Sequence, residues 1–337
     1  VFVTTQPGLL LFNSAKPSQR KTIDVVVQAN KDINDQVQVE YNYRDTKGKA
    51  ADSLTRWQKG EKKYFPVTIS NEGLKQNSSE SLNAFVSVKN IAEKQYLAQH
   101  KISYDHIPDI NYSHVDAVKI INLDLKTEGQ SVGYIPGAGD RVPEALEQMG
   151  YKVTMLKEAD LKTPYLRQFD AIVTGVRAYN TNEWLSGAYE SLMEYVKEGG
   201  VLLVQYNTNN SIGPVKARIS PYPFTISRNR ITDEEAKVNF LLPSHPALNH
   251  PNKIKEKDFE GWIQKRSIYN AEKVDRNYQR ILSMKDPGEN EQDGSLIISK
   301  YGKGRFVYTG LVFFRELPAG VPGAYRLFAN LIANKRK

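Results

Sequence analysis

Short runs of hydrophobic and β-branched residues fill the first hundred positions. The clearest runs are TIDVVVQ (22–28), VQVEYNY (37–43), KYFPVTI (63–69) and LNAFVSV (82–88), with turn-forming residues such as Asn30-Lys31-Asp32 between them. Runs of this length without a 3.6-residue period predict strands rather than helices. We therefore expect residues 1–115 to form an all-β, immunoglobulin-like sandwich domain. Residues 116–130 are expected to be a connector.

The pattern changes at position 131, where apolar strands begin to alternate with helices. Strands are predicted at 131–136, 151–156, 169–175, 201–206, 295–300 and 305–309, and helices at 142–149, 184–196 and 322–334. Continuous apolar strands that alternate with helices are typical of a parallel sheet covered on both faces. We expect residues 131–337 to form this α/β domain. An insertion at about 207–294 is too long for a structureless loop and predicts extra strands and turns over or beside the sheet's carboxyl edge.

The length and charge of the chain favour two domains and argue against nucleic-acid binding. A chain of 337 residues favours two domains. The formal charge is +8, but Lys and Arg are interleaved with acids over most of the length, which argues against a nucleic-acid partner. No apolar run reaches the roughly 18 to 20 residues that a membrane-spanning helix needs, so no membrane span is expected.

The chain contains no cysteine. This excludes disulfides, thiolate metal sites and a cysteine nucleophile. The sequence opens on Val1-Phe2-Val3, without Met and without a charged-then-apolar leader. We therefore expect it to be a processed chain or a piece of a longer one.

Polar residues follow several predicted strands of the α/β domain. Ligands of open α/β sheets bind outside the carboxyl ends of the strands, where the strand order reverses. This rule selects the following ligand-binding candidates: Arg177, Tyr179, Asn180, Tyr206, Asn207, Asn209, Arg315 and Glu316. Arg177, Tyr179 and Asn180 could instead pin the following loop. Arg315 with Glu316 could be a structural ion pair.

Gly137, Ala138 and Gly139 follow the first of these strands and precede a helix. Their N–H groups are candidates for binding an anion at the helix start. The run is not GxGxxG, however, and Asp140 with Pro143 fits a helix N-cap better.

No activated nucleophile is found in the sequence. The turn after the fourth strand, where a nucleophile would stand, holds Tyr206-Asn207, and no GxSxG occurs. His245 and His250 have a poor metal-ligand spacing and fit turn residues, so neither a metal nor a cofactor is predicted. The carboxylates Asp140, Asp258, Glu260 and Glu316 remain candidates for acid/base work, with Asp258 and Glu260 on one face if KDFEGW is a strand.

Several blocks resemble a known family. They include VGYIPGAGDRVPEALEQMGYKVTMLKEADL, FDAIVTGVRAYNTNEWL and, most specific, FFRELPAGVPGAYRLFANLI. Over roughly 104–332 the chain resembles the C-terminal region of large LmbE-like (PIG-L family) deacetylases of Bacteroidetes type. The resemblance implies a β-rich segment and a flavodoxin-like domain similar to class I glutamine amidotransferases. It also implies an N-terminal zinc-dependent de-N-acetylase domain in the parent chain and a periplasmic or cell-surface setting.

The family's catalytic residues do not carry over. No His-Pro-Asp-Asp motif occurs, and His245-Pro246-Ala247 does not reproduce one. The resemblance therefore implies a non-catalytic accessory region, which binds glycan or holds the deacetylase domain. The alternatives are a carboxylate-based hydrolase acting on a carbohydrate-type substrate, and a purely structural spacer.

Overall fold

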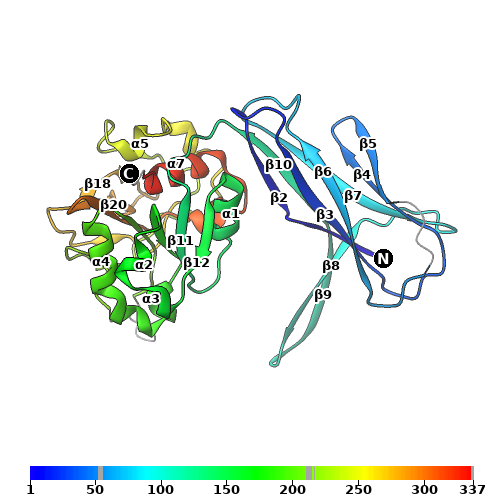
Figure 1. Cartoon of the computed structure of the whole chain (residues 1–337), viewed down its shortest axis with the longest axis horizontal. Coiled ribbons are helices and arrows are strands. Elements are labelled where there is room, and N and C mark those ends of the chain that lie inside the picture. Colours follow the sequence, from blue (N-terminus) through cyan, green and yellow to red (C-terminus); the bar gives the residue numbers. More distant parts are fainter. Residues whose placement is uncertain (52–55, 210–214, 216, 335–337) are drawn as a thin grey trace. The chain divides into compact units, whose positions relative to one another are not determined.

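The computed structural model describes residues 1–51, 56–209, 215 and 217–334. The chain divides into two compact units, Val1–Asp124 and Leu125–Lys337 (Figure 1). The boundary corrects the sequence analysis, because part of the expected connector at 116–130 is a strand of the first unit. Among the described residues, no helix is long and apolar enough to span a membrane.

The first unit contains two sheets that share one core. A three-stranded sheet has the order β1 (Phe2–Gln6), β3 (Arg20–Gln28) and β6 (Lys62–Ser70). A five-stranded sheet has the order β2 (Leu9–Asn13), β10 (Ala117–Leu123), β7 (Ser78–Val88), β4 (Val37–Tyr43) and β5 (Thr46–Ala51). Buried residues of both sheets, such as Val25 and Val86, belong to the same apolar cluster. The predicted sandwich is therefore present, and all four predicted strands are confirmed.

Two further strands of this unit form a separate ribbon. β8 (Leu97–Tyr104) and β9 (Ile107–Val115) are antiparallel and, among the described residues, form a two-stranded sheet of their own. Figure 1 shows this ribbon extending away from the sheets of its unit. The sequence predicts a last strand near residue 105 but not the long hairpin.

The second unit is built on a seven-stranded sheet. Its strand order is β12 (Lys152–Met155), β11 (Ser131–Ile135), β13 (Ala171–Thr174), β14 (Val201–Gln205), β21 (Gly304–Thr309), β20 (Leu296–Tyr301) and β18 (Gln279–Arg280). The first five strands are parallel, and β20 and β18 are antiparallel. Numbered along the chain, the parallel strands have the order 2-1-3-4-5, which is the flavodoxin-like arrangement of doubly wound sheets.

Helices cover both faces of this sheet. Leu202 and Phe306 pack in one cluster with Leu192 and Val196 of α4 (Tyr189–Lys197). Side chains alternate along a strand, so Arg305 lies on the other face. There its guanidinium donates to main-chain carbonyls at the end of α7 (Pro322–Ile332), for example to that of Ala333 at 2.6 Å.

The remaining helices lie between strands of the sheet, except α6, which lies between β21 and α7. They are α1 (Val142–Met149), η1 (Glu158–Asp160), α2 (Thr163–Leu166), α3 (Ala178–Thr181), η2 (Glu183–Ala188) and α6 (Phe313–Glu316). The helix predicted at 184–196 is thus a 3₁₀ segment followed by α4. The insertion carries β15 (Thr225–Ile226), β16 (Asn239–Phe240), α5 (Pro246–Asn249), η3 (Glu256–Phe259), β17 (Ala271–Glu272), β18 and β19 (Leu282–Ser283).

Candidate functional site

Segments from four strands meet at the carboxyl edge of the sheet. Since β11, β13, β14 and β21 are parallel, the residues that follow them emerge at the same edge. Gly137 follows β11, Arg177 follows β13, Tyr206 follows β14, and Arg315 lies in the short helix after β21. The strand order reverses between β11 and β13, which is where doubly wound folds place their ligands.

Asp140 organises the first of these segments. One carboxylate oxygen accepts hydrogen bonds from the Tyr134 hydroxyl at 2.5 Å and from the Val142 N–H at 3.0 Å. The other oxygen accepts from the Val176 N–H at 3.0 Å. Asp140 therefore holds the start of α1 and ties the segment after β11 to the segment after β13. This agrees with its predicted capping role, although the formal N-cap residue of α1 is Arg141.

The glycine run lies too close to its neighbour to be a free anion cradle. A Cβ on Gly137 would lie 2.1 Å from the Val176 carbonyl oxygen, so only glycine fits there. The Ala138 N–H donates to that same oxygen at 2.8 Å. Ala138 is therefore removed from the anion-binding candidates. Gly139 remains, with a left-handed φ of 97° that lets the chain turn into α1.

Arg177 occupies an unusual backbone position. Its φ is 58° and its ψ is 24°, a left-handed conformation that costs a residue other than glycine about 1 kcal/mol or more. The side chain is exposed and makes no hydrogen bond or ion pair to another described residue. Strained backbone of this kind is concentrated at functional sites. The left-handed conformation turns the chain sharply from β13 into α3, and the Arg177 guanidinium lies at the sheet edge.

Three of the predicted ligand-binding residues are structural. Asn207 is fully buried, and its side-chain oxygen accepts from the Tyr179 N–H at 3.0 Å. Tyr179 is also buried. The Asn180 amide is paired twice with the backbone of Thr208, at 3.0 and 2.8 Å. The Asn207 and Asn180 side chains pin the loop after β13 to the loop after β14, and the Tyr179 ring packs in the apolar core, which corrects the expectation that these three side chains contact a ligand.

Tyr206 is the centre of an aromatic cluster. Its ring stacks on Tyr269 with centroids 5.7 Å apart and an interplanar angle of 6°, and lies 5.4 Å from Phe314. Tyr269 also has a left-handed φ, 51°, and its carbonyl accepts from the Tyr308 hydroxyl at 2.7 Å. Burial raises the pKa of the Tyr206 hydroxyl, and the nearby charges of Arg177 and Arg315 oppose that rise. Both arginines therefore lie within electrostatic range of one hydroxyl.

Arg315 and Glu316 have separate surroundings and form no ion pair with each other within the described parts of the chain. The Arg315 guanidinium lies 5.0 Å from the Phe314 ring centre. The Glu316 carboxylate is completely buried and accepts from the Ile263 N–H at 3.1 Å. Burial raises the pKa of Glu316 to about 8. Arg315 therefore remains a ligand-binding candidate, whereas Glu316 supports the loop of the insertion.

Asn209 is the last candidate at this edge. Its side chain is exposed, and its amide donates to the Ile226 carbonyl at 2.8 Å. The accessible candidates at this edge are therefore Arg177 and Asn209, which are exposed, and Arg315, which is half-exposed, whereas the Tyr206 ring is itself buried. Tyr269 and Phe314 were missed as site residues, since nothing in the sequence shows that the insertion returns to stack on Tyr206.

The histidines and the other candidate carboxylates lie in different surroundings. His245 accepts from the Ala247 N–H at the start of α5, and His250 lies 2.9 Å from Glu128. Asp258 is buried against Arg326 at 2.5 Å and is part of a 3₁₀ turn, whereas Glu260 is exposed. The expectation that KDFEGW is a strand with both carboxylates on one face is therefore wrong.

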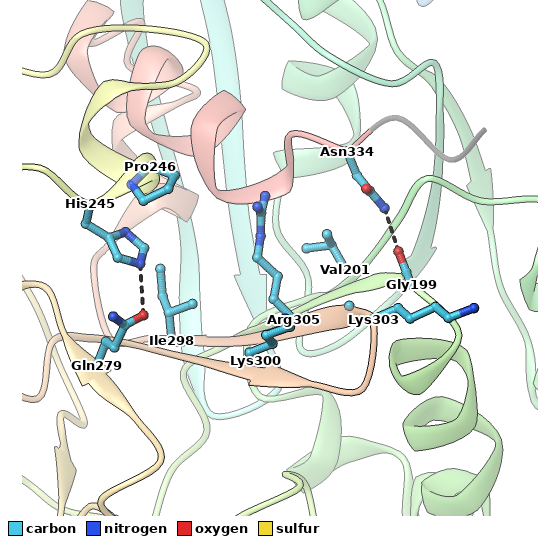
Figure 2. Close-up of a pocket in the computed structure, with 11 residues that line it drawn as sticks. Gly199, Val201, His245, Pro246, Gln279, Ile298, Lys300, Lys303, Arg305 and Asn334 are labelled. Atoms are coloured by element: carbon cyan, nitrogen blue, oxygen red, sulfur yellow. Dashed lines mark hydrogen bonds between the residues drawn. The ribbon is translucent and has the colours of Figure 1, made fainter.

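A pocket of about 270 Å³ lies at the opposite, amino edge of the sheet (Figure 2). Its lining includes Val201, the first residue of β14, and Arg305, the second residue of β21. It also includes His245, which shares a hydrogen bond of 3.1 Å with Gln279. Burial lowers the pKa of His245. Figure 2 shows the Lys303 ammonium directed away from the other side chains, and Arg305 is held by α7. The pocket therefore lacks a converging set of free polar groups.

Comparison with known proteins finds no matching family model and no matching curated protein. Solved structures that are similar include a cold-adapted β-galactosidase from Rahnella sp. R3, at 14% identity over 60% of this chain and 31% of that one, with a TM-score of 0.36. A protein from Thermoplasma acidophilum, assigned to GMP synthase, matches at 13% identity over 61% of this chain and 94% of that one, with a TM-score of 0.37. A ThuA-like protein from Bacteroides uniformis matches at 12% identity over 63% and 94%, also with a TM-score of 0.37.

The chain spans about a third of the length of the β-galactosidase that it matches. TM-scores this low do not establish a shared fold. The flavodoxin-like arrangement of the α/β unit follows from its own strand order.

Proposed function

We propose that this chain is a non-catalytic accessory region of a zinc-dependent N-acetyl-sugar deacetylase of the PIG-L/LmbE type. In this proposal the first unit is an immunoglobulin-like sandwich, and the second is an amidotransferase-like domain that has kept the fold without the chemistry. The second unit binds glycan at its carboxyl edge. The setting is periplasmic or at the cell surface, as the family resemblance implies.

The observation that carries the binding proposal is the cluster of Arg177, Arg315 and Tyr206. Sugars offer apolar ring faces together with many hydroxyl groups, and some carry a carboxylate. An aromatic cluster flanked by guanidinium groups matches both features. The half-exposed Phe314 and Tyr269 rings, which the buried Tyr206 ring supports, pack on the sugar face, and the arginines donate to its oxygens. Strained backbone at Arg177 and at Tyr269 supports a role for this edge beyond folding.

We propose that this edge is not catalytic, because its carboxylates are engaged in structural hydrogen bonds. Asp140 is occupied by three donors, and Glu316 is buried against a backbone N–H. A hydrolase needs two carboxyl groups about 5 to 10 Å apart in one cleft, with access to the substrate. No observation in the described part of the chain favours such a pair, so the hydrolase alternative is not developed further.

Glycan-array binding by the full chain tests this proposal. We expect the wild type to bind a subset of glycans, and Arg177→Ala and Arg315→Ala each to weaken that binding about 10-fold or more, since a hydrogen bond to a charged group contributes about 1.5–3 kcal/mol. Arg276→Ala is the matched control, because Arg276 is also exposed but lies outside the cluster. Binding unchanged in both cluster variants would reject the site.

The link to a deacetylase has its own test. The reading frame upstream of Val1 should encode a domain with a His-Pro-Asp-Asp motif. A frame that encodes an unrelated domain would remove the accessory role and leave the binding proposal standing.

A further inference from the structure

The segments that reach the carboxyl edge of the α/β unit are basic. Residues 175–182, which follow β13, contain Arg177 and no Asp or Glu. Residues 206–232, which follow β14, contain four basic residues and no acid. The segments 263–271 and 310–315, which supply the two half-exposed aromatic rings, contain no acid either. Positive charge is therefore gathered at this edge, although acids and bases are interleaved over most of the chain.

The acids beside these segments are already engaged with other partners. Asp140 accepts from three donors, none of which is an arginine side chain. Glu316 is buried, and burial raises its pKa to about 8, so it is mostly protonated at pH 7. Glu234 accepts from the Gln264 N–H at 2.5 Å and forms no ion pair in the described part of the chain. The arginines of the edge are therefore left without a carboxylate partner.

Three guanidinium groups from separate segments lie at this edge. Arg177 is exposed and forms no hydrogen bond or ion pair to another described residue, and the half-exposed Arg315 donates only to a main-chain carbonyl, at 3.5 Å. Both lower the pKa of the Tyr206 hydroxyl, so both lie within electrostatic range of it. Arg228 is exposed and donates through Nε to the Asn209 carbonyl at 3.4 Å. Like charges gathered in this way favour a bound anion.

Arg177 stands at a position that glycine would occupy more easily. Its φ of 58° is sterically costly for any residue with a Cβ and free of cost for glycine. The folded chain does not use the guanidinium in return, since the side chain forms no hydrogen bond or ion pair within the described residues. A side chain that costs stability without such a contact is expected to serve a ligand.

We propose that the glycan bound at this edge is acidic, and that Arg177 and Arg315 hold its carboxylate or sulfate group. This inference rests on the proposed glycan binding and names the class of glycan. A guanidinium bonds to a charged oxygen about twice as strongly as to a neutral one, and its fork fits two oxygens of the same group. The half-exposed Phe314 and Tyr269 rings pack on the sugar face, and Arg228 adds attraction at longer range.

Titration calorimetry of the full chain with matched pairs of oligosaccharides tests the inference. The pairs are an oligogalacturonide and its methyl ester, sialyllactose and lactose, and a carrageenan oligosaccharide before and after desulfation. We expect the acidic member of at least one pair to bind about 10-fold or more tightly than the neutral member, because it accepts charge-assisted hydrogen bonds from the arginines. Preference in the first two pairs identifies a carboxylate, and preference in the third identifies a sulfate. Added salt should reduce the preference, because exposed charges are screened.

Two variants assign the preference to the arginines. Arg177→Gly removes the guanidinium and relieves the backbone, so it should bring the affinity for the acidic member down toward that for the neutral member without lowering Tm. Arg315→Gln should reduce the preference in the same direction. Arg44→Gly is the matched control, because Arg44 is also exposed and has a left-handed φ of 54°, but lies in the turn between β4 and β5 of the first unit. It should leave binding unchanged.

The outcomes separate this inference from the proposed function. Equal binding of the acidic and neutral members would overturn the inference and leave glycan binding standing. Binding to no member of any pair would overturn both. An acid preference that persists in Arg177→Gly and in Arg315→Gln would also overturn the inference, because other groups would then hold the anion.

Discussion

Replacement of Asp140 by alanine is predicted to destabilise the α/β unit without involving any catalytic step. The carboxylate accepts from the Tyr134 hydroxyl at 2.5 Å and from the N–H groups of Val142 and Val176 at 3.0 Å. Each hydrogen bond to a charged acceptor is worth about 1.5–3 kcal/mol, but Asp140 is half-exposed, so water can replace part of this. Water cannot replace the lost acceptor of the Tyr134 hydroxyl as easily, because the Tyr134 side chain is only 2% exposed. We expect a loss of about 2–4 kcal/mol.

The assay is calorimetric unfolding of the full chain, resolved into the transitions of the two units. For a unit of about 200 residues, 1 kcal/mol shifts Tm by about 2–4 °C, so Asp140→Ala should lower the Tm of the α/β transition by roughly 5–15 °C and leave the other transition unchanged. Tyr134→Phe removes one donor only and should give a smaller shift. A change of less than about 0.5 kcal/mol for Asp140→Ala would refute the structural role of this carboxylate.

Three further changes test other parts of the account. Arg326→Ala should cost about 3–5 kcal/mol in unfolding free energy, because it leaves the buried Asp258 carboxylate without its cation; urea denaturation measures this. Burial raises the pKa of Glu316 to about 8, so its contribution to stability is present at pH 4.5 and lost as the pH rises through 8. Glu316→Gln should therefore flatten the fall in Tm between pH 5 and pH 9, measured as paired melting curves. Gly137→Ala should lower both stability and glycan binding, whereas Gly187→Ala, with no atom within 4 Å of its new Cβ, should do neither.

The predictions for Arg326→Ala and Glu316→Gln each have an outcome that would contradict them. Arg280 forms an exposed ion pair with Asp293, so Arg280→Ala should cost at most about 1 kcal/mol. An equal loss for Arg280→Ala and Arg326→Ala would refute the argument from burial. A steep pH dependence that persists in Glu316→Gln would assign that dependence to another group.

Local patterns were enough to predict much of the fold. The strands of the α/β unit and the helix that begins at Val142 follow from apolar runs, glycine stops and proline near the helix start. Strand β10 was mistaken for connector, because its pairing with β2 and β7 is set by the first unit as a whole. The hairpin of β8 and β9 was missed as well, because its extent is set by the pairing of its two strands with each other across the turn at Asp105-His106.

The site was predicted only in part. The strand-end rule located Arg177, Tyr206 and Arg315, since strand direction determines which residues reach the edge. The rule does not distinguish a side chain that faces solvent from one that pins a loop, and Asn207 was misjudged for that reason. Tyr269 could not be found, because its position depends on how the insertion folds back on the sheet.

The central claim is that the carboxyl edge of the α/β unit binds glycan without reacting with it. A crystal structure of the full chain in complex with a glycan that it binds tests this most directly. The account predicts an intact glycan that contacts the Arg177 and Arg315 guanidinium groups and packs beside Phe314 and Tyr269. A glycan bound elsewhere, such as in the pocket beside His245, or one found cleaved or deacetylated at the edge, would contradict it.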